Sequence, residues 1–317
     1  MSNLIGLEHL TSYLKKGSHN YYLLCCASFE GRCLSIPLTI SGSLLKKCII
    51  YKTSNDLGDS EINLNKLLAV YKCENTQQFR ISTEDPILTV SAFYDSLTSI
   101  FENDDSVDLL CDITTFSREA LLILLRTLYK LRNHFRSLKL LYNPASSMSQ
   151  TWLTMGITDF RSVLGFAGEF SLQKPLHLIV LTGFEVERAV ATIEEYEPDI
   201  ISIGIGDKEN SISEEFYKKN NLFLKDLIDI YGARVNVFHY SLTDPYACKL
   251  AIQNYLDSVD SANFIISPMN NKISTIGAGL VGIERKDIQL SYTKPLEYNV
   301  EDYSKPTDSV YVMSLDF

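Results

Sequence analysis

The chain has 317 residues, of which 45% are hydrophobic and 21% are charged, and its formal net charge is −10. This length predicts about two domains or one large α/β domain, and the composition excludes a disordered chain. The acidic balance, with a pI near 5.1, excludes a general nucleic-acid binder, which would present a basic face to the phosphates.

The amino-terminal residues and the apolar runs decide the expected location. Residues 1–17 include Glu8, Lys15 and Lys16 and lack a basic region followed by an apolar core, so they do not resemble a secretory signal. No apolar run reaches the roughly 18 to 20 residues that a bilayer span needs. We therefore expect a cytoplasmic protein that does not enter a membrane.

Seven cysteines occur along the chain, most of them in or beside apolar runs. They are Cys25, Cys26, Cys33, Cys48, Cys73, Cys111 and Cys248. Their odd number and spacing match neither a disulfide framework nor a metal site. We expect reduced residues that pack in the core, with no bound metal and no cofactor.

Short apolar runs alternate with longer helical patterns, as in buried and mainly parallel sheets. In the first half we expect strands at 21–27, 47–52, 79–82 or 87–90, 107–112 and 138–142. In the second half we expect them at 176–181, 200–205, 234–239, 263–267 and 288–292. The matching numbers predict two tandem Rossmann-like units of the α/β class, each a mainly parallel sheet flanked by helices.

Helical spacing of apolar residues predicts helices at 117–136 and 213–231, among others. The boundary between the units is expected within 143–175, where glycine and proline gather, with a short helix at 149–155. The predicted units are 1–155 and 156–317.

An internal repeat supports the two units. Each first strand is followed by a small residue, Phe, Glu and then Arg, so Glu30 and Arg32 correspond to Glu185 and Arg188. Glu30 precedes Asp112 by 82 residues, and Glu185 precedes Ser267 by 82 residues. The fifth strands end in turns that hold Tyr142 and Tyr292, each shortly before a proline. Signals in one order at nearly equal intervals predict a duplication.

These signals fall at the carboxyl ends of strands, where open α/β sheets bind ligands. Arg118 and Lys272 open the helices that follow the fourth strands, and a helix amino terminus with a basic residue suits a phosphate or carboxylate. The alternative is that both are solvated residues of the first helical turn. The turn residues Ser28, Thr114 and Asn271 are further candidates for ligand binding.

The repeated Glu and Arg residues have two interpretations. Glu30 with Arg32, and Glu185 with Arg188, can hold ligand hydroxyls or supply an acid and an orienting cation. Alternatively, each carboxylate stabilises a helix amino terminus and pairs with its arginine. The rings of Tyr142 and Tyr292 either wall a pocket or pack on the sheet.

Common catalytic motifs are absent from the sequence. It contains no phosphate-binding G-x-x-x-x-G-K-[ST] loop, no G-x-S-x-G elbow and no H-E-x-x-H. Gly204-Ile205-Gly206 lacks the third glycine of the dinucleotide fingerprint.

The fourth predicted strand of each half leads into a polar turn with a basic residue. These turns are Asp112-Ile113-Thr114-Thr115-Phe116-Ser117-Arg118 and Asn270-Asn271-Lys272-Ile273-Ser274. They resemble the strand-to-helix motif of CARF-type Rossmannoid sensors. The resemblance implies a symmetric pocket between two copies for a cyclic or linear oligonucleotide, often in bacterial antiviral defence.

We weigh three hypotheses. The first is a ligand-sensing or partner-binding protein of prokaryotic defence or regulation that holds a nucleotide-like anion between its two halves. The second is an enzyme acting on a nucleotide or phosphorylated sugar, with Glu30, Asp112 or Glu185 as general acid or base. The third is a non-catalytic scaffold subunit with a protein partner in a defence complex.

Overall fold

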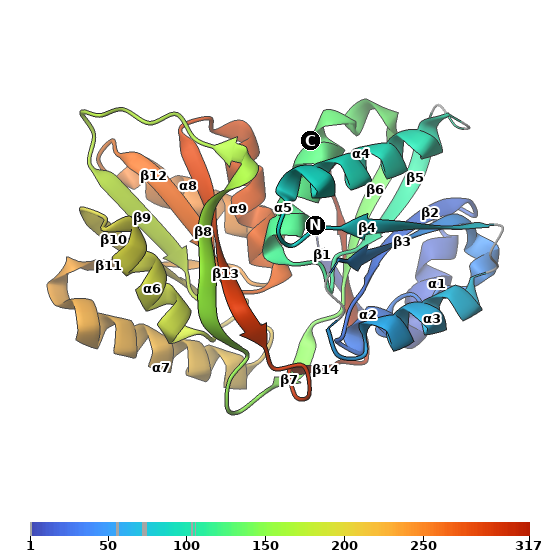
Figure 1. The fold of residues 1–317 in the computed structure, drawn as a ribbon, viewed down its shortest axis with the longest axis horizontal. Helices are drawn as coiled ribbons and strands as arrows, with labels where there is room; N and C mark the ends of the chain where they lie inside the picture. Colours follow the sequence, from blue (N-terminus) through green and yellow to red (C-terminus); the bar gives the residue numbers. More distant parts are fainter. Residues whose placement is uncertain (1, 55–56, 72–74, 103, 105) are drawn as a thin grey trace. The chain divides into compact units, whose positions relative to one another are not determined.

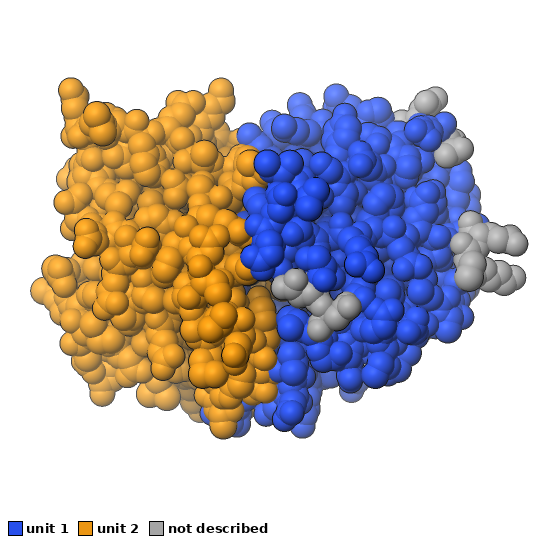
Figure 2. All heavy atoms as spheres, viewed as in Figure 1, with its two compact units in different colours: residues 1–150, 300–317 blue, residues 151–299 orange. Residues whose placement is uncertain are grey.

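The computed structural model describes residues 2–54, 57–71, 75–102, 104 and 106–317 (Figure 1). Two compact units are present (Figure 2): unit 1 is Met1–Gln150 with Val300–Phe317, and unit 2 is Thr151–Asn299. This division differs from the expected 1–155 and 156–317, because the last residues return to unit 1 as a strand beside its fifth parallel strand.

Unit 1 contains a sheet of seven described strands in the order β1-β15-β6-β5-β2-β3-β4. The five neighbouring strands β6, β5, β2, β3 and β4 run parallel to one another. Strand β15 pairs antiparallel with β6, and β1 pairs antiparallel with β15. The bounds are β1 Ser2–Gly6, β2 Tyr21–Ala27, β3 Leu45–Thr53, β4 Thr76–Ile81, β5 Val107–Asp112, β6 Phe135–Tyr142 and β15 Ser309–Ser314. Strands β2 and β5 are buried at every residue, which is why β2 appears in the sequence as a continuous apolar run and β5 as an apolar run that only Asp108 and Asp112 interrupt.

The helices of unit 1 cover both faces of its sheet, with α4 and α5 on one face and α1, α2 and α3 on the other (Figure 1). They are α1 Leu7–Lys15, α2 Arg32–Ser35, α3 Ser60–Val70, α4 Pro86–Phe101 and α5 Arg118–Lys130. Local sequence sets the starts of the last two. Asp85 caps α4 ahead of Pro86, and the Ser117 hydroxyl accepts from the Ala120 N–H at the start of α5.

Unit 2 contains a sheet of six strands in the order β11-β10-β9-β12-β13-β8. The bounds are β8 Thr154–Ala167, β9 Leu176–Leu181, β10 Ile200–Gly206, β11 Val235–Tyr240, β12 Asn263–Pro268 and β13 Ile288–Tyr298. The parallel strands are β11, β10, β9, β12 and β13, and β8 pairs antiparallel with β13. Numbered within each unit, the parallel strands of both follow the Rossmann order 3-2-1-4-5, with an antiparallel strand beside the fifth.

The helices of unit 2 pack in pairs, α6 with α7 and α8 with α9. Their bounds are α6 Val186–Tyr196, α7 Glu214–Tyr231, α8 Pro245–Ser258 and α9 Lys272–Glu284. The side chains of Ser213, Asp244 and Asn271 cap α7, α8 and α9 by accepting from backbone N–H groups of the first turn.

The fold class is therefore confirmed as two Rossmann-like α/β units. Of the two sites considered for the third strand of unit 1, 79–82 overlaps β4, whereas 87–90 lies inside α4 and was wrong as a strand. The predicted helix at 149–155 is also wrong. Residues 149–153 form an irregular link between β7 (Ala145–Met148) and β8, and these two strands pair with β14 (Ser304–Pro306) and β13 from far along the chain.

Candidate functional site

The first βα turn of unit 1 holds a buried ion pair. The guanidinium of Arg32 contacts Glu30 Oε2 through Nη2 at 2.6 Å and Nε at 3.0 Å, and the two side chains are only 5% and 8% exposed. Ser304 Oγ bonds to both partners, and Arg32 Nη1 donates to the carbonyl of Asn143 at 3.1 Å. Burial alone lowers the pKa of Arg32, but the Glu30 carboxylate outweighs it and raises the pKa above its ordinary value.

Unit 2 repeats this arrangement at the start of α6. Arg188 Nη1 contacts Glu185 Oε2 at 3.2 Å, with exposed fractions of 6% and 9%. Arg188 Nη2 donates to the carbonyl of Thr293, and Glu185 Oε1 accepts from the Thr154 hydroxyl. The structure thus pairs each repeated Glu with its Arg, which is the second of the two interpretations given for these residues.

The two arginines reach equivalent acceptors. Asn143 directly follows Tyr142 on β6, and Thr293 directly follows Tyr292 on β13. In each unit the fourth parallel strand lies between the first and the fifth, so the arginine ties the first βα turn to the fifth strand across the fourth. This tie accounts structurally for two of the repeated sequence signals at once.

The carboxyl end of β5 carries Asp112, whereas β12 ends in Ser267 and Pro268. Asp112 is 2% exposed, and its Oδ1 accepts from the Thr114 N–H at 3.0 Å and the Thr114 hydroxyl at 2.5 Å. Thr114 Oγ1 in turn accepts from the Asn143 N–H at 3.0 Å. Loss of solvation raises the pKa of Asp112 to about 7, while the Thr114 bonds and the Arg32 charge oppose the rise.

The other turn residues and the paired tyrosines are built into the scaffold. Ser28 Oγ accepts from the Glu30 N–H at 3.3 Å, and its carbonyl accepts from Asn63 Nδ2 at 2.9 Å. Tyr142 is 4% exposed and lies against Tyr311, with 6.5 Å between ring centroids. Tyr292 is 7% exposed, and the Arg188 guanidinium lies 5.6 Å from its ring centroid.

Arg118 and Lys272 occupy matching positions as the first residues of α5 and α9. The residue before each one caps the helix. Ser117 Oγ accepts from the Ala120 N–H at 3.1 Å, and Asn271 Oδ1 accepts from the Ser274 N–H at 2.9 Å. Asn271 also donates to the carbonyl of Leu242 at 2.8 Å. Both basic residues are half-buried.

In both units, direct contacts join the loop after the fourth parallel strand to the carboxyl end of the first or to the loop that follows it. In unit 1, the Thr115 hydroxyl donates to the carbonyl of Cys26 at 2.7 Å. In unit 2, Asn270 Nδ2 donates to the carbonyl of Thr182 at 2.5 Å, and a Cβ added at Gly183 would lie 2.3 Å from the Met269 carbonyl oxygen. These contacts hold the chain together at the point where the strand order reverses, which is the usual ligand position in such sheets.

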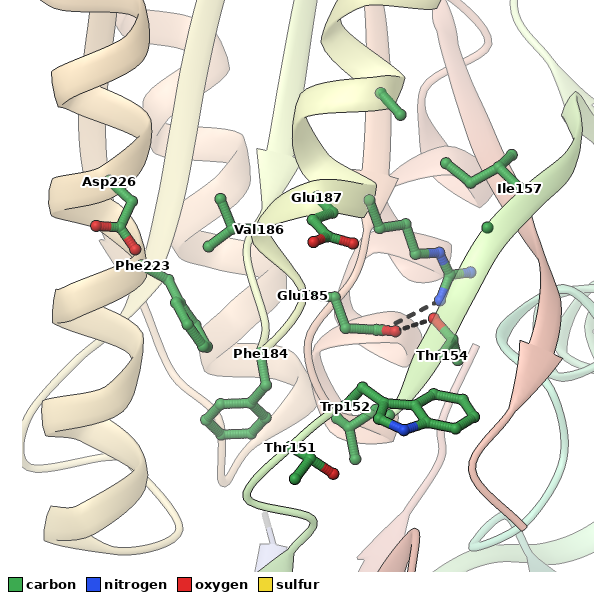
Figure 3. Close-up of a pocket in the computed structure, with 14 residues that line it drawn as sticks. Thr151, Trp152, Thr154, Ile157, Phe184, Glu185, Val186, Glu187, Phe223 and Asp226 are labelled. Atoms are coloured by element: carbon green, nitrogen blue, oxygen red, sulfur yellow. Dashed lines mark hydrogen bonds and ion pairs between the residues drawn. The ribbon is translucent and has the colours of Figure 1, made fainter.

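A pocket of about 450 Å³ lies beside the start of α6, with walls from α7 and from the segment that leads into β8 (Figure 3). Of the predicted site residues it includes Glu185 and Arg188. Sequence reasoning missed Trp152, Phe223 and Asp226, because the first was expected in a helix and the others look like ordinary positions of the helical pattern of α7. Trp152 is the only tryptophan of the sequence, and this was the signal that could have pointed to the pocket.

The remaining predictions concern metals, thiols and membranes. No group of three or more metal-ligating side chains occurs among the residues that the structure describes. Six cysteines are buried and free, and Cys73 lies outside the described residues. No helix in the described part of the chain is long and apolar enough to cross a membrane.

Neither a protein-family model nor a curated protein matches this sequence.

Proposed function

We propose that this chain is a ligand-sensing protein that binds the phosphate groups of a nucleotide-like anion at the amino termini of α5 and α9. The observation that carries the proposal is the recurrence of a basic first residue, Arg118 and Lys272, behind a capping side chain in both units. The resemblance to CARF-type sensors adds the expected setting, prokaryotic defence or regulation.

The electrostatics of a helix end favour this assignment. The amino terminus of a helix carries roughly half a positive charge and N–H groups that no carbonyl of the same helix accepts. A lysine or arginine there adds positive charge where it is intrinsically unfavourable, by about 0.3 to 1 kcal/mol. A bound phosphate would reverse the sign of this interaction, because it accepts from the N–H groups and from the basic side chain together.

Binding is favoured over catalysis by the two repeated glutamates because both carboxylates are enclosed. Glu30 and Glu185 are each at most 9% exposed and are held by an arginine. A general acid or base must come within hydrogen-bond reach of the reacting group. These carboxylates support the fold around the proposed site instead.

A second candidate function is an enzyme acting on a nucleotide or phosphorylated sugar, with Asp112 as the acid or base. The observation in its favour is the pKa of Asp112, which burial raises to about 7 and thus close to the value that suits proton transfer at neutral pH. Turnover that disappears in Asp112→Asn, while ligand affinity persists, would establish this alternative.

The proposal is tested by calorimetric titration with mononucleotides and with cyclic and linear oligonucleotides. We expect Arg118→Ala and Lys272→Ala each to weaken binding about tenfold or more, whereas Lys130→Ala, at the opposite end of α5, leaves it unchanged. Thermal melting checks that all three variants remain folded. Unchanged affinity in both Arg118→Ala and Lys272→Ala would show that the site is wrong.

A further inference from the structure

The pocket beside α6 has a chemistry opposite to that of the anion sites. We propose that it binds a small organic cation with a flat apolar body, such as an aromatic amine. Its volume of about 450 Å³ lies within the range of roughly 300 to 1,000 Å³ that is usual for small-molecule sites. It also lies at the carboxyl end of β9, beside the first βα turn of unit 2.

The lining of the pocket carries a net negative charge. The lining contains the carboxylates of Glu185, Glu187 and Asp226 and one guanidinium, that of Arg188, which leaves a formal charge of −2. Lys219, whose Nζ lies 5.6 Å from the Phe184 ring centroid, adds one positive charge and the dipole of α6 adds about half of one, so the pocket stays negative. A phosphate would therefore be repelled here.

Two of the three carboxylates are available to a ligand. Arg188 engages Glu185, but within the described part of the chain neither Glu187 nor Asp226 forms an ion pair, and both are exposed. Glu187 lies on the first turn of α6 and Asp226 on α7, so two separate helices present carboxylates at this pocket (Figure 3).

The aromatic rings of the pocket also favour a cation. Trp152, Phe184 and Phe223 line the same pocket, and the face of an aromatic ring attracts cations, tryptophan most strongly. Lys219 Nζ already lies 5.6 Å from the ring centroid of Phe184 and 6.0 Å from that of Phe223. Trp152, which is 37% exposed, has no such cation among the described side chains and is left for the ligand.

The experiment uses the full chain and compares two ligands of the same shape and opposite charge. Phenethylamine is the cationic probe, and phenylacetate is its anionic counterpart. Trp152 is the only tryptophan in the sequence, so its selectively excited emission reports on this pocket directly. We expect a saturable change with phenethylamine and none with phenylacetate.

Variants locate the binding. Glu187→Gln with Asp226→Asn should weaken phenethylamine binding about tenfold or more, and Lys219→Met should strengthen it by removing a competing positive charge. Trp152→Phe should abolish the optical signal while calorimetry still detects binding, since a ring remains. The control Glu209→Gln, which changes a carboxylate that does not line the pocket, should leave affinity unchanged.

Three results would overturn the proposal. They are equal or tighter binding of phenylacetate, phenethylamine affinity that is insensitive to the Glu187 and Asp226 substitutions, and no saturable binding of phenethylamine up to about 10 mM, since a weaker interaction carries less than about 3 kcal/mol.

Discussion

Arg32 donates from Nη1 to the backbone carbonyl of Asn143, 111 positions further along the chain, at 3.1 Å. This bond joins the first βα turn of unit 1 to the end of β6, and its counterpart in unit 2 joins Arg188 to Thr293. A guanidinium suits this role because its planar fork serves a carboxylate and a carbonyl simultaneously. The tie fixes the loop geometry around the carboxyl ends of three strands.

We expect Arg32→Met to destabilise unit 1 by about 3 kcal/mol or more, because it leaves the buried Glu30 carboxylate without its cation. Hydrogen exchange of peptides from β6 measures the effect within unit 1. Adding Glu30→Gln should restore part of the loss, since no unpaired charge then remains.

The exposed Arg132 provides the control, and Arg132→Met should change stability by less than about 1 kcal/mol. Equal effects of Arg32→Met and Arg132→Met would contradict a structural role for the Arg32 tie.

Asp112 should make unit 1 less stable as pH rises. Burial raises its pKa to about 7 from an ordinary 3.8, so the folded state binds a proton more tightly than the unfolded state. The corresponding stability is fully present below pH 3.8 and is lost as pH rises through about 7. Between pH 5 and pH 8 the loss is on the order of 3 kcal/mol.

Hydrogen exchange of β5 peptides at several pH values measures this loss. The Asp112→Asn variant should lack the dependence, because its amide does not titrate. A wild-type slope that survives in Asp112→Asn would assign the titration to another group.

The stability of unit 2 should fall as pH is lowered, because of His177. This residue is fully buried on β9, its Nε2 lies 2.6 Å from Ser202 Oγ, and burial lowers its pKa from 6.5 to about 4. The folded state therefore resists protonation. Its stability is present above pH 6.5 and falls as pH drops through about 4, by on the order of 3 kcal/mol in total.

Unfolding of unit 2 is followed by the emission of Trp152, the single tryptophan. His177→Gln should flatten the acid side of the profile, whereas His239→Gln, at an exposed position of β11, should leave it unchanged. The reverse pattern would rule out His177 as the titrating group.

The sequence predicted the central strands well, for a physical reason. Strands β2, β5 and β9 match their predicted bounds because burial on both faces makes their residues apolar or small, with Asp108, Asp112 and His177 as the exceptions. Strands β7, β8 and β15 escaped prediction because their partners lie far along the chain, and no local pattern specifies such pairing.

The sequence likewise predicted only part of the candidate site. The pairing of Glu30 with Arg32 and of Glu185 with Arg188 followed from local spacing. The carbonyl acceptors at Asn143 and Thr293 did not, since backbone groups leave no mark in a sequence. The pocket was missed because Trp152 and Asp226 come together only through tertiary packing.

Gly183 should tolerate no side chain, because its Cα faces the loop after β12. A Cβ there would lie 2.3 Å from the Met269 carbonyl oxygen and 3.2 Å from Asn270 Cα, both of them backbone atoms that cannot rotate away. We expect Gly183→Ala to destabilise unit 2 by about 2 kcal/mol or more through overpacking, as measured by denaturation monitored at Trp152.

Gly31→Ala is the matched control at the equivalent turn of unit 1, since nothing lies within 4 Å of its added Cβ and its φ is −59°. That variant should be neutral or slightly stabilising in hydrogen exchange. If Gly183→Ala were as stable as the wild type, the loops after β9 and β12 would have room to separate, and their close packing would not be required for the stability of unit 2.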